Sequence, residues 1–174
     1  MPHNILLPLR HTLSILLLPF MVVVVIPCLL LFFLSEYDHR WVDSSFITWM
    51  PRIIGFVVFA VGLLLFCWCL SLFARVGKGT LAPWDPTQNL VAVGPYCHVR
   101  NPMISGVALM LVGHTLFWGS WLIGAWTCFF ALINHLYFIL SEEPGLEDRF
   151  GEIYRIYKAT VPRWIPRLKS WSGE

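Results

Sequence analysis

Long apolar runs alternate with short polar segments along this chain, and the lengths of the runs predict membrane-spanning helices. The four runs are Thr12 to Leu34, Pro51 to Ala74, Met103 to Phe117 and Trp121 to Leu140. About 20 mainly apolar residues are needed for a helix to cross the hydrocarbon core of a bilayer. We therefore expect an all-α, polytopic integral membrane protein with about four transmembrane helices.

The breaks between the runs indicate how the helices are connected. Only Gly119 and Ser120 separate the third run from the fourth, so the last two helices should form a tight helical hairpin. The third run has 15 residues and is expected to stop short of the full bilayer. The first run follows Arg10 as a signal peptide would, but it is too long and lacks a small-residue cleavage site. We therefore expect a retained first helix.

Basic residues are distributed unequally between the two sides of this arrangement. Four spans place both termini on one side, with ten of the twelve basic residues. These ten are Arg10, Arg75, Lys78, Arg100, Arg149, Arg155, Lys158, Arg163, Arg167 and Lys169. Only Arg40 and Arg52 fall on the other side, so the positive-inside rule predicts cytoplasmic termini and an external loop at residues 35–50. The tryptophans near span ends, typical of an aromatic belt, are Trp41, Trp49, Trp118 and Trp121.

The composition agrees with a membrane protein and excludes several other classes. Hydrophobic residues make up 57% of the chain and charged residues 13%, against about 45–50% and about 25% in soluble domains. A net charge of +2 without a basic stripe excludes a nucleic-acid-binding domain and a disordered chain. The five cysteines form no C-x-x-C pair, so neither a disulfide framework nor a metal site is expected.

The polar segments divide the chain into two parts. Residues 1–74 hold two N-terminal transmembrane helices and the external loop, and residues 75–174 hold a cytoplasmic loop, the helical hairpin and a C-terminal helix. Segment 75–102 is rich in Gly and Pro, which predicts a structured loop. Segment 141–174 has apolar residues at helical spacing, which predicts one amphipathic helix on the membrane surface or folded back on the spans. Its apolar face consists of Leu146, Phe150, Ile153, Tyr154 and Tyr157.

The first candidate site is the run Arg100, Asn101 and Pro102. Asn is a favoured N-cap and Pro a favoured first helical residue, so the third helix should begin here. A helix N-terminus attracts anions, and the guanidinium of Arg100 beside it can bind a carboxylate or phosphate with two hydrogen bonds. The alternative is a plain helix cap next to a positive-inside arginine.

The other candidates lie at the end of the fourth helix. Glu142 and Glu143 could bind a cation, an ammonium group or ribose hydroxyls, or could simply be the acidic first turn of the next helix. His135 lies seven residues before Glu142, about two turns, and shares its helix face. An ionisable residue at membrane depth indicates function unless it forms an interhelical hydrogen bond. A ligand between the cationic terminus and the acidic pair should carry an anionic group and a cationic or hydroxyl-rich group, as a nucleoside–amino acid conjugate does.

Three ordered motifs occupy roughly residues 75–167 and make this reading more specific. They are Gly94-Pro95-Tyr96 with Val99-Arg100-Asn101-Pro102-Met103; Glu142-Glu143-Pro144 with Leu146, Phe150-Gly151, Tyr154 and Tyr157; and Val161-Pro162-Arg163-Trp164 with Pro166. The chain thereby resembles the isoprenylcysteine carboxyl methyltransferase family and its phospholipid methyltransferase relatives. The resemblance implies a multi-pass membrane methyltransferase that uses S-adenosylmethionine, releases S-adenosylhomocysteine and acts on a lipid-like or small amphipathic acceptor.

The resemblance also implies a site. In that family the last two spans and their flanking segments enclose the cofactor on the cytoplasmic side. The implied cofactor-binding residues are Tyr96, Val99, Arg100, Asn101, Pro102, Gly106, His135, Glu142, Glu143 and Tyr154, with Phe150 and Tyr157 closing the pocket. The candidate catalytic residues are His135, Glu142, Glu143 and Arg163. Asn101 stands where the family usually has His, and Ile104 where it often has Tyr.

Two other functions are compatible with the sequence. Membrane sterol reductases, which use NADPH, resemble this architecture and have an ending somewhat like Val161-Pro162 to Ile165-Pro166. The pattern from Gly94 to Pro102 and the run Glu142-Glu143-Pro144 argue against that class. A non-catalytic membrane subunit whose polar ends dock a partner is the other alternative. Whether the methyl acceptor is a carboxylate, an amine or a thiol stays open.

Overall fold

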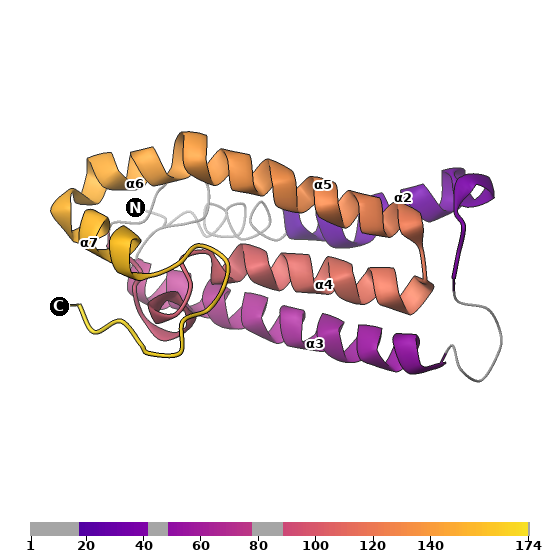
Figure 1. The fold of residues 1–174 in the computed structure, drawn as a ribbon, viewed down its shortest axis with the longest axis horizontal. Helices are drawn as coiled ribbons and strands as arrows, with labels where there is room; N and C mark the ends of the chain where they lie inside the picture. Colours follow the sequence, from indigo (N-terminus) through magenta and orange to yellow (C-terminus); the bar gives the residue numbers. More distant parts are fainter. Residues whose placement is uncertain (1–17, 42–48, 78–88, 174) are drawn as a thin grey trace, which may run out of the picture.

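The computed structural model describes residues 18–41, 49–77 and 89–173, and within these ranges it contains helices and turns but no strand (Figure 1). The predicted all-α class is confirmed for this part of the chain. In chain order the elements are η1 (Met21–Val25), α2 (Ile26–Phe33), η2 (Ser35–Tyr37), α3 (Trp49–Leu72), η4 (Phe73–Gly77), η5 (Gly94–Cys97), α4 (Pro102–Trp118), α5 (Trp121–Tyr137), η6 (Phe138–Glu142), α6 (Glu143–Phe150) and α7 (Glu152–Thr160). The expected loop at 75–102 is described only at its two ends.

Two of the described helices are long and apolar enough to cross a membrane. They are Trp49–Leu72, with 24 residues, and Trp121–Phe150, with 30 residues. The helices Leu18–Phe33 and Pro102–Trp118 are apolar but shorter. At 1.5 Å per residue, α4 with its 17 residues is about 25 Å long, less than the roughly 30 Å hydrocarbon core. The short third helix is therefore confirmed, whereas the crossing of four helices stays a prediction.

The turn between α4 and α5 has the tight geometry that the sequence predicts. Gly119 ends α4 with a φ of 60°, the left-handed conformation that glycine adopts without strain. Ser120 then caps α5, because its side-chain oxygen accepts a hydrogen bond from the backbone N–H of Ile123 at 3.2 Å. Two residues thus reverse the chain, and the predicted helical hairpin is confirmed.

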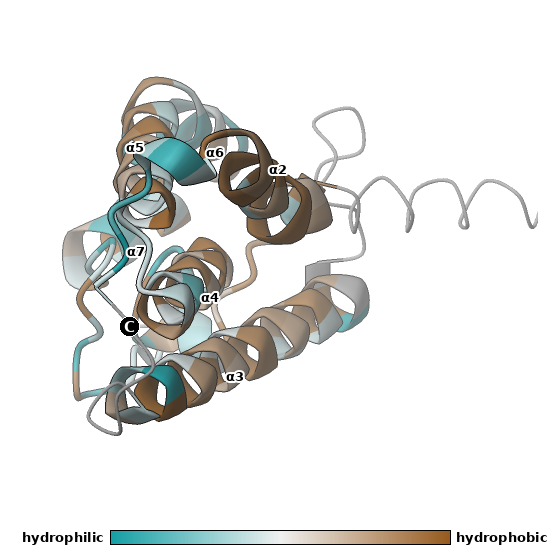
Figure 2. Cartoon of the chain, turned by 90° about the vertical axis from the view of Figure 1, so that its right-hand side faces the viewer, coloured by the Kyte–Doolittle hydropathy of each residue, from teal (hydrophilic) through white to brown (hydrophobic). Residues whose placement is uncertain are grey.

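Helix α4 lies between α3 and α5 in both views of the fold (Figures 1 and 2). Its contact with α3 depends on two pairs of glycines, Gly55 with Gly113 and Gly62 with Gly106. A Cβ atom added at Gly62 would lie 2.6 Å from the backbone oxygen of Gly106, which is too close. Small residues at such a crossing let two helix backbones approach directly, as is common between membrane helices.

The fourth helix does not end where the sequence predicts. Instead of a new helix starting at Pro144, α5 continues through the π-helical turn η6 into α6, as one helix from Trp121 to Phe150. The π turn places the N–H of Glu143 on the oxygen of Phe138, so the chain accommodates Pro144 without a break. Conversely, the single C-terminal amphipathic helix was a wrong prediction. Gly151, with a φ of 56°, separates α6 from α7, and α7 folds back (Figure 1).

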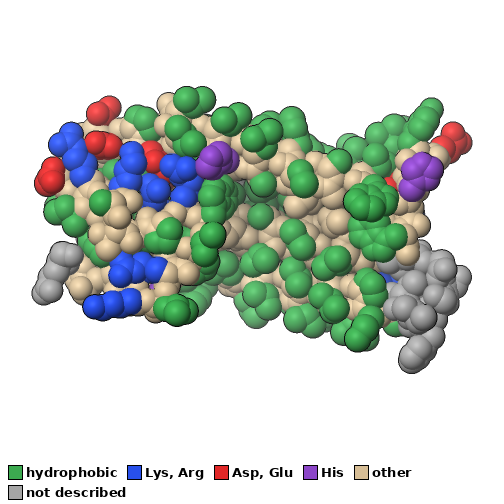
Figure 3. Space-filling model, in the orientation of Figure 1, with side chains coloured by type: hydrophobic (Ala, Val, Ile, Leu, Met, Phe, Trp, Pro, Cys, Tyr) green, Lys and Arg blue, Asp and Glu red, His purple; other side chains and the backbone are tan. Residues whose placement is uncertain are grey.

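The surface separates into an apolar body and a charged end. Side chains of Lys, Arg, Asp and Glu gather over α6, α7 and the C-terminal segment, while hydrophobic side chains cover most of the remaining length (Figure 3). Helix α3, for example, exposes Phe56, Val61 and Leu64, each of which is more than half accessible. An apolar surface of this extent is expected to face lipid. The candidate site residues from the sequence lie towards the charged end.

Candidate active site

The C-terminal segment after α7 lies along the loop that precedes α4. The backbone N–H of Arg100 donates to the oxygen of Pro162 at 2.9 Å, and the N–H of Arg167 donates to the oxygen of His98 at 3.0 Å. The N–H of Trp171 donates to the oxygen of Cys97 at 3.1 Å. These bonds bring the first and third sequence motifs together, although the hairpin and two further helices separate them in the chain.

Glu143 joins both of these segments to helix α6. Its Oε1 accepts a hydrogen bond from Nη1 of Arg100 at 2.8 Å and another from Nε of Arg163 at 2.7 Å. Its Oε2 lies 3.4 Å from Nζ of Lys158 on α7. The side chains of Glu143 and Arg100 are only 6% and 11% exposed. One buried carboxylate therefore holds three cationic side chains, which come from three different segments.

The electrostatics of this cluster leave it positively charged. Burial alone would raise the pKa of Glu143, but the hydrogen bond from Arg163 and the charges of Arg100, Arg163 and Lys158 bring it below its ordinary value. Glu143 is therefore ionised at neutral pH. Three cations against one carboxylate leave a surplus of positive charge. Glu147 offsets part of it, because its Oε2 lies 3.4 Å from Nζ of Lys158. The cluster suits an anionic ligand.

Glu142 differs from Glu143 in its ion pairing and in the direction of its pKa shift. It makes no ion pair among the described residues, and it lies beyond Leu140, outside the uncharged part of the helix. Burial, together with the negative charge of Glu143, raises the pKa of Glu142 to about 7. It lies close enough to Tyr96 and Tyr154 to influence the pKa of each hydroxyl. The sequence treated the two acids as equivalent, and the structure separates them.

A buried aromatic group adjoins these charges. Tyr154 and Tyr157 are 2% and 3% exposed, and the hydroxyl of Tyr157 donates to the backbone oxygen of Tyr96 at 2.7 Å. Burial raises the pKa of Tyr154 to about 12, so this hydroxyl stays protonated. Phe150 packs partly buried against the pair, whereas Ile153 is 62% exposed. Of the predicted apolar face, all but Ile153 is therefore at least partly buried.

His135 takes part in a contact that the sequence did not reveal. Its Nδ1 accepts a hydrogen bond from the indole N–H of Trp164 at 3.0 Å. In the neutral ring the proton must then be on Nε2. Trp164 also packs on Phe138, with ring centroids 5.5 Å apart. The C-terminal segment is thus attached to the fourth helix as well as to the loop before α4.

We expect the effects of substituting Trp164 and His135 on the free energy of unfolding to be coupled. Trp164→Phe keeps the ring contact with Phe138 but removes the N–H donor, and His135→Phe removes the acceptor. A double-mutant cycle on thermal unfolding in detergent micelles should give a coupling energy of about 0.5–1.5 kcal/mol. Additive effects of the two substitutions would show that the hydrogen bond contributes nothing.

Three of the predicted site residues, Val99, Asn101 and Pro102, lie at or just before the start of α4. Asn101 occupies the N-cap position, but its side chain makes no capping hydrogen bond, so the expected side-chain cap is wrong. Its φ of −121° and ψ of 55° lie outside the extended region that such a cap requires, and its backbone oxygen accepts from Ser105 instead. Pro102 is fully buried at the first helical position, and Val99 is 5% exposed.

Gly106 faces helix α3, whereas the family resemblance implied that it would face the cofactor. A Cβ atom there would lie 2.9 Å from the backbone oxygen of Gly62 and 3.0 Å from the nitrogen of Phe66. The close approach that glycine permits is therefore between two helices. The structure adds Lys158 and Trp164 to the candidate site. Trp164 belongs to the third motif but was given no role there, and basic character alone did not distinguish Lys158 from the other basic residues.

Comparison with known proteins places this geometry in a family. The family model for phospholipid methyltransferase matches residues 50–153, more than half of the chain. The chain belongs to the phospholipid methyltransferase family. The suspected relationship is thereby confirmed, and the sterol-reductase alternative is not favoured. An uncharacterized protein of Haemophilus influenzae is 36% identical over 63 residues, which cover 36% of this chain and 100% of that protein. No solved structure matches the chain.

Proposed function

We propose that the protein is an S-adenosylmethionine-dependent membrane methyltransferase that acts on a lipid-like or amphipathic acceptor. The observation that carries the proposal is the cluster in which Glu143 joins Arg100 and Arg163, because it brings together residues of the three motifs on which the sequence resemblance rests. The proposed cofactor site lies among the loop before α4, the end of the fourth helix and the C-terminal segment. By the positive-inside rule we place it, with both termini, at the cytoplasmic face.

The residues present fit the two charged ends of the cofactor's methionine. The positively charged cluster around Glu143 complements a carboxylate, and Nε of Arg100 is buried without a hydrogen-bond partner among the described residues. Because Glu143 already neutralises cations, Glu142 is the acid left to bind the ammonium group or ribose hydroxyls. The roles of Arg100 and Glu142 inferred from the sequence are kept, while Glu143 becomes a residue that positions the two arginines.

The chain's own contribution to methyl transfer is positioning in an apolar setting. When bound, S-adenosylmethionine supplies a methyl group on a positively charged sulfur. Transfer to an anionic acceptor disperses charge, so the buried ring of Tyr154 and the side chain of Val99 would favour the transition state by excluding water. The positively charged cluster around Glu143 and the carboxylate of Glu142 would hold the two ends of the methionine group and so fix the direction of approach.

An amine acceptor requires a base, and the hydrogen bonds favour Glu142 over His135. The neutral His135 ring can accept a proton only at Nδ1, which Trp164 already occupies. Glu142, whose pKa is about 7 in the free protein, is the candidate base in the arrangement in which it faces the ribose hydroxyls and not the ammonium group. A carboxylate or thiolate acceptor needs no base, and the same geometry serves it.

Cofactor affinity should depend on pH through Glu142. Only ionised Glu142 can pair with the ammonium group, and its pKa in the free protein is about 7. The affinity for S-adenosylhomocysteine should therefore fall as the pH drops below 7, approaching tenfold per pH unit, and should level off above it. Isothermal titration calorimetry between about pH 6 and about pH 8 would measure this. Glu142→Gln should bind more weakly and lose the dependence; a variant with the wild-type profile would contradict the assignment.

Titration of the purified protein with S-adenosylhomocysteine and, separately, with NADPH tests the proposed cofactor class. We expect saturable binding of the first and none of the second. Arg100→Lys keeps the positive charge but loses the bidentate donor, and we expect it to bind about tenfold more weakly or worse. Binding of NADPH alone, or of neither compound, would contradict the proposal.

A further inference from the structure

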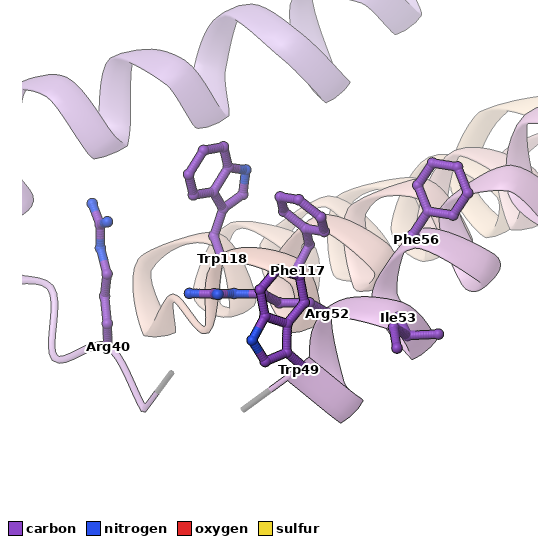
Figure 4. A pocket seen from close by; sticks show the side chains of 7 residues that line it. All are labelled: Arg40, Trp49, Arg52, Ile53, Phe56, Phe117 and Trp118. Atoms are coloured by element: carbon purple, nitrogen blue, oxygen red, sulfur yellow. The ribbon is translucent and has the colours of Figure 1, made fainter. Parts of the chain in front are cut away.

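A hollow lies at the opposite end of the helices from the Glu143 cluster. It has a volume of about 420 Å³ (Figure 4). Its lining includes Arg40, Arg52, Trp49, Phe56, Phe117 and Trp118. The volume is within the range of small-ligand sites, and most of the lining is aromatic. In Figure 4 the guanidinium of Arg52 extends in the direction of Arg40.

The positions of the two arginines favour an anion nearby. In the topology predicted from the sequence, they are the two basic residues on the side opposite to the other ten, against the positive-inside distribution. Arg52 also lies in the first turn of α3, where the helix dipole disfavours a cation and where no acidic residue is present. The ring of Trp49, 5.5 Å from the guanidinium carbon, partly offsets this.

The existing carboxylate in this region does not satisfy both cations. Asp38 lies 3.4 Å from Nε of Arg40, but its side chain is fully buried and its Oδ1 accepts from the N–H of Leu122. Within the described ranges, no carboxylate lies within ion-pair distance of Arg52. Within the part of the chain that the structure describes, the hollow therefore combines one guanidinium without an ion-pair partner, one partly paired guanidinium and an apolar lining.

We propose that this hollow binds the phosphate of an anionic phospholipid in the leaflet opposite the methyl-transfer site. A phosphate would bridge Arg40 and Arg52 and sit near the N-terminus of α3, and the glycerol and upper acyl chains would contact Trp49, Trp118 and Phe56. A lipid is favoured over free phosphate because most of the lining is apolar and because the tryptophans mark the membrane boundary. The site is independent of the proposed cofactor and methyl acceptor.

Native mass spectrometry of the detergent-solubilised full chain, titrated with phosphatidylglycerol or with phosphatidylcholine of the same acyl chains, tests this proposal. We expect one phosphatidylglycerol to be retained more tightly than phosphatidylcholine, and at least about tenfold weaker retention in Arg52→Gln. Arg40→Gln, which lies outside any helix, should weaken it as well. Arg149→Gln removes one exposed positive charge at the other end and should retain the lipid as wild type does.

Three results would overturn the proposal. One is equal retention by wild type and both hollow variants, and another is a loss in Arg149→Gln that matches the loss in Arg52→Gln. The third is displacement of the lipid by excess inorganic phosphate, which would identify a soluble anion as the occupant. Far-UV circular dichroism of each variant, compared with wild type, establishes that the protein tested is folded.

Discussion

Glu143→Ala should lower the stability of the protein by about 3–5 kcal/mol, the usual cost of removing one partner from a buried ion pair. The substitution leaves the guanidiniums of Arg100 and Arg163 facing each other without the carboxylate oxygen that both now contact, at 2.8 and 2.7 Å. It also detaches the C-terminal segment from the fourth helix at one of its two points of attachment. Thermal unfolding in detergent micelles measures the loss.

Glu147→Ala is the matched control for this experiment. It removes a carboxylate from the same helix, and Glu147 also pairs with an arginine, Arg155, at 2.8 Å. That arginine side chain is 61% exposed, so water replaces the lost interaction and little change is expected. If the two variants unfolded at the same temperature, Glu143 would not be the centre of the site that we describe.

Gly62→Ala should destabilise the protein although alanine is the better helix former. The added Cβ would lie 2.6 Å from the oxygen of Gly106 and 2.8 Å from the nitrogen of Met110, and backbone atoms cannot rotate away. The helices must separate, at a cost of about 1–3 kcal/mol. Gly113→Ala, with three contacts below 3.0 Å, should behave in the same way.

Gly145→Ala provides the control for the glycine series. Gly145 lies in α6, and a Cβ there meets nothing within 4 Å. This substitution should stabilise the helix by up to about 1 kcal/mol, because alanine loses less backbone entropy on folding. One set of unfolding curves measures both the loss of stability expected for Gly62→Ala and the gain expected for Gly145→Ala. A stabilising Gly62→Ala would contradict the close α3–α4 contact.

Local sequence signals predicted two of the points at which the chain starts a helix or turns. Pro102 marks the start of α4, and Gly119 with Ser120 marks the hairpin turn, as expected. Pro144 was misleading because its missing N–H can be accommodated by a π turn as well as by a helix start. Gly151 was overlooked as a break because the apolar periodicity continues through it. Periodicity reports which face is buried, and it does not report whether one helix or two carry that face.

The composition of the candidate site was predictable, but its pairing was not. The sequence singled out Arg100, Glu143 and Arg163, yet treated the first as free to bind an anion and the second as free to bind a cation. Their mutual contact joins residues 43 and 20 positions apart, and it depends on how α7 and the C-terminal segment fold back. The different roles of Glu142 and Glu143 follow from that contact. No spacing rule could assign them.

Methyl transfer itself is the most direct test of the account. Host membranes that contain the wild-type protein, Glu142→Gln or no added protein are incubated with methyl-labelled S-adenosylmethionine, and label is counted in the lipid extract and identified by mass. We expect label in a lipid-like product that depends on the wild-type protein and falls roughly 10- to 150-fold with Glu142→Gln, the range for a lost hydrogen bond to a charged group. No label above that of membranes without the protein, or equal label with Glu142→Gln, would contradict the proposed activity or the proposed site, respectively.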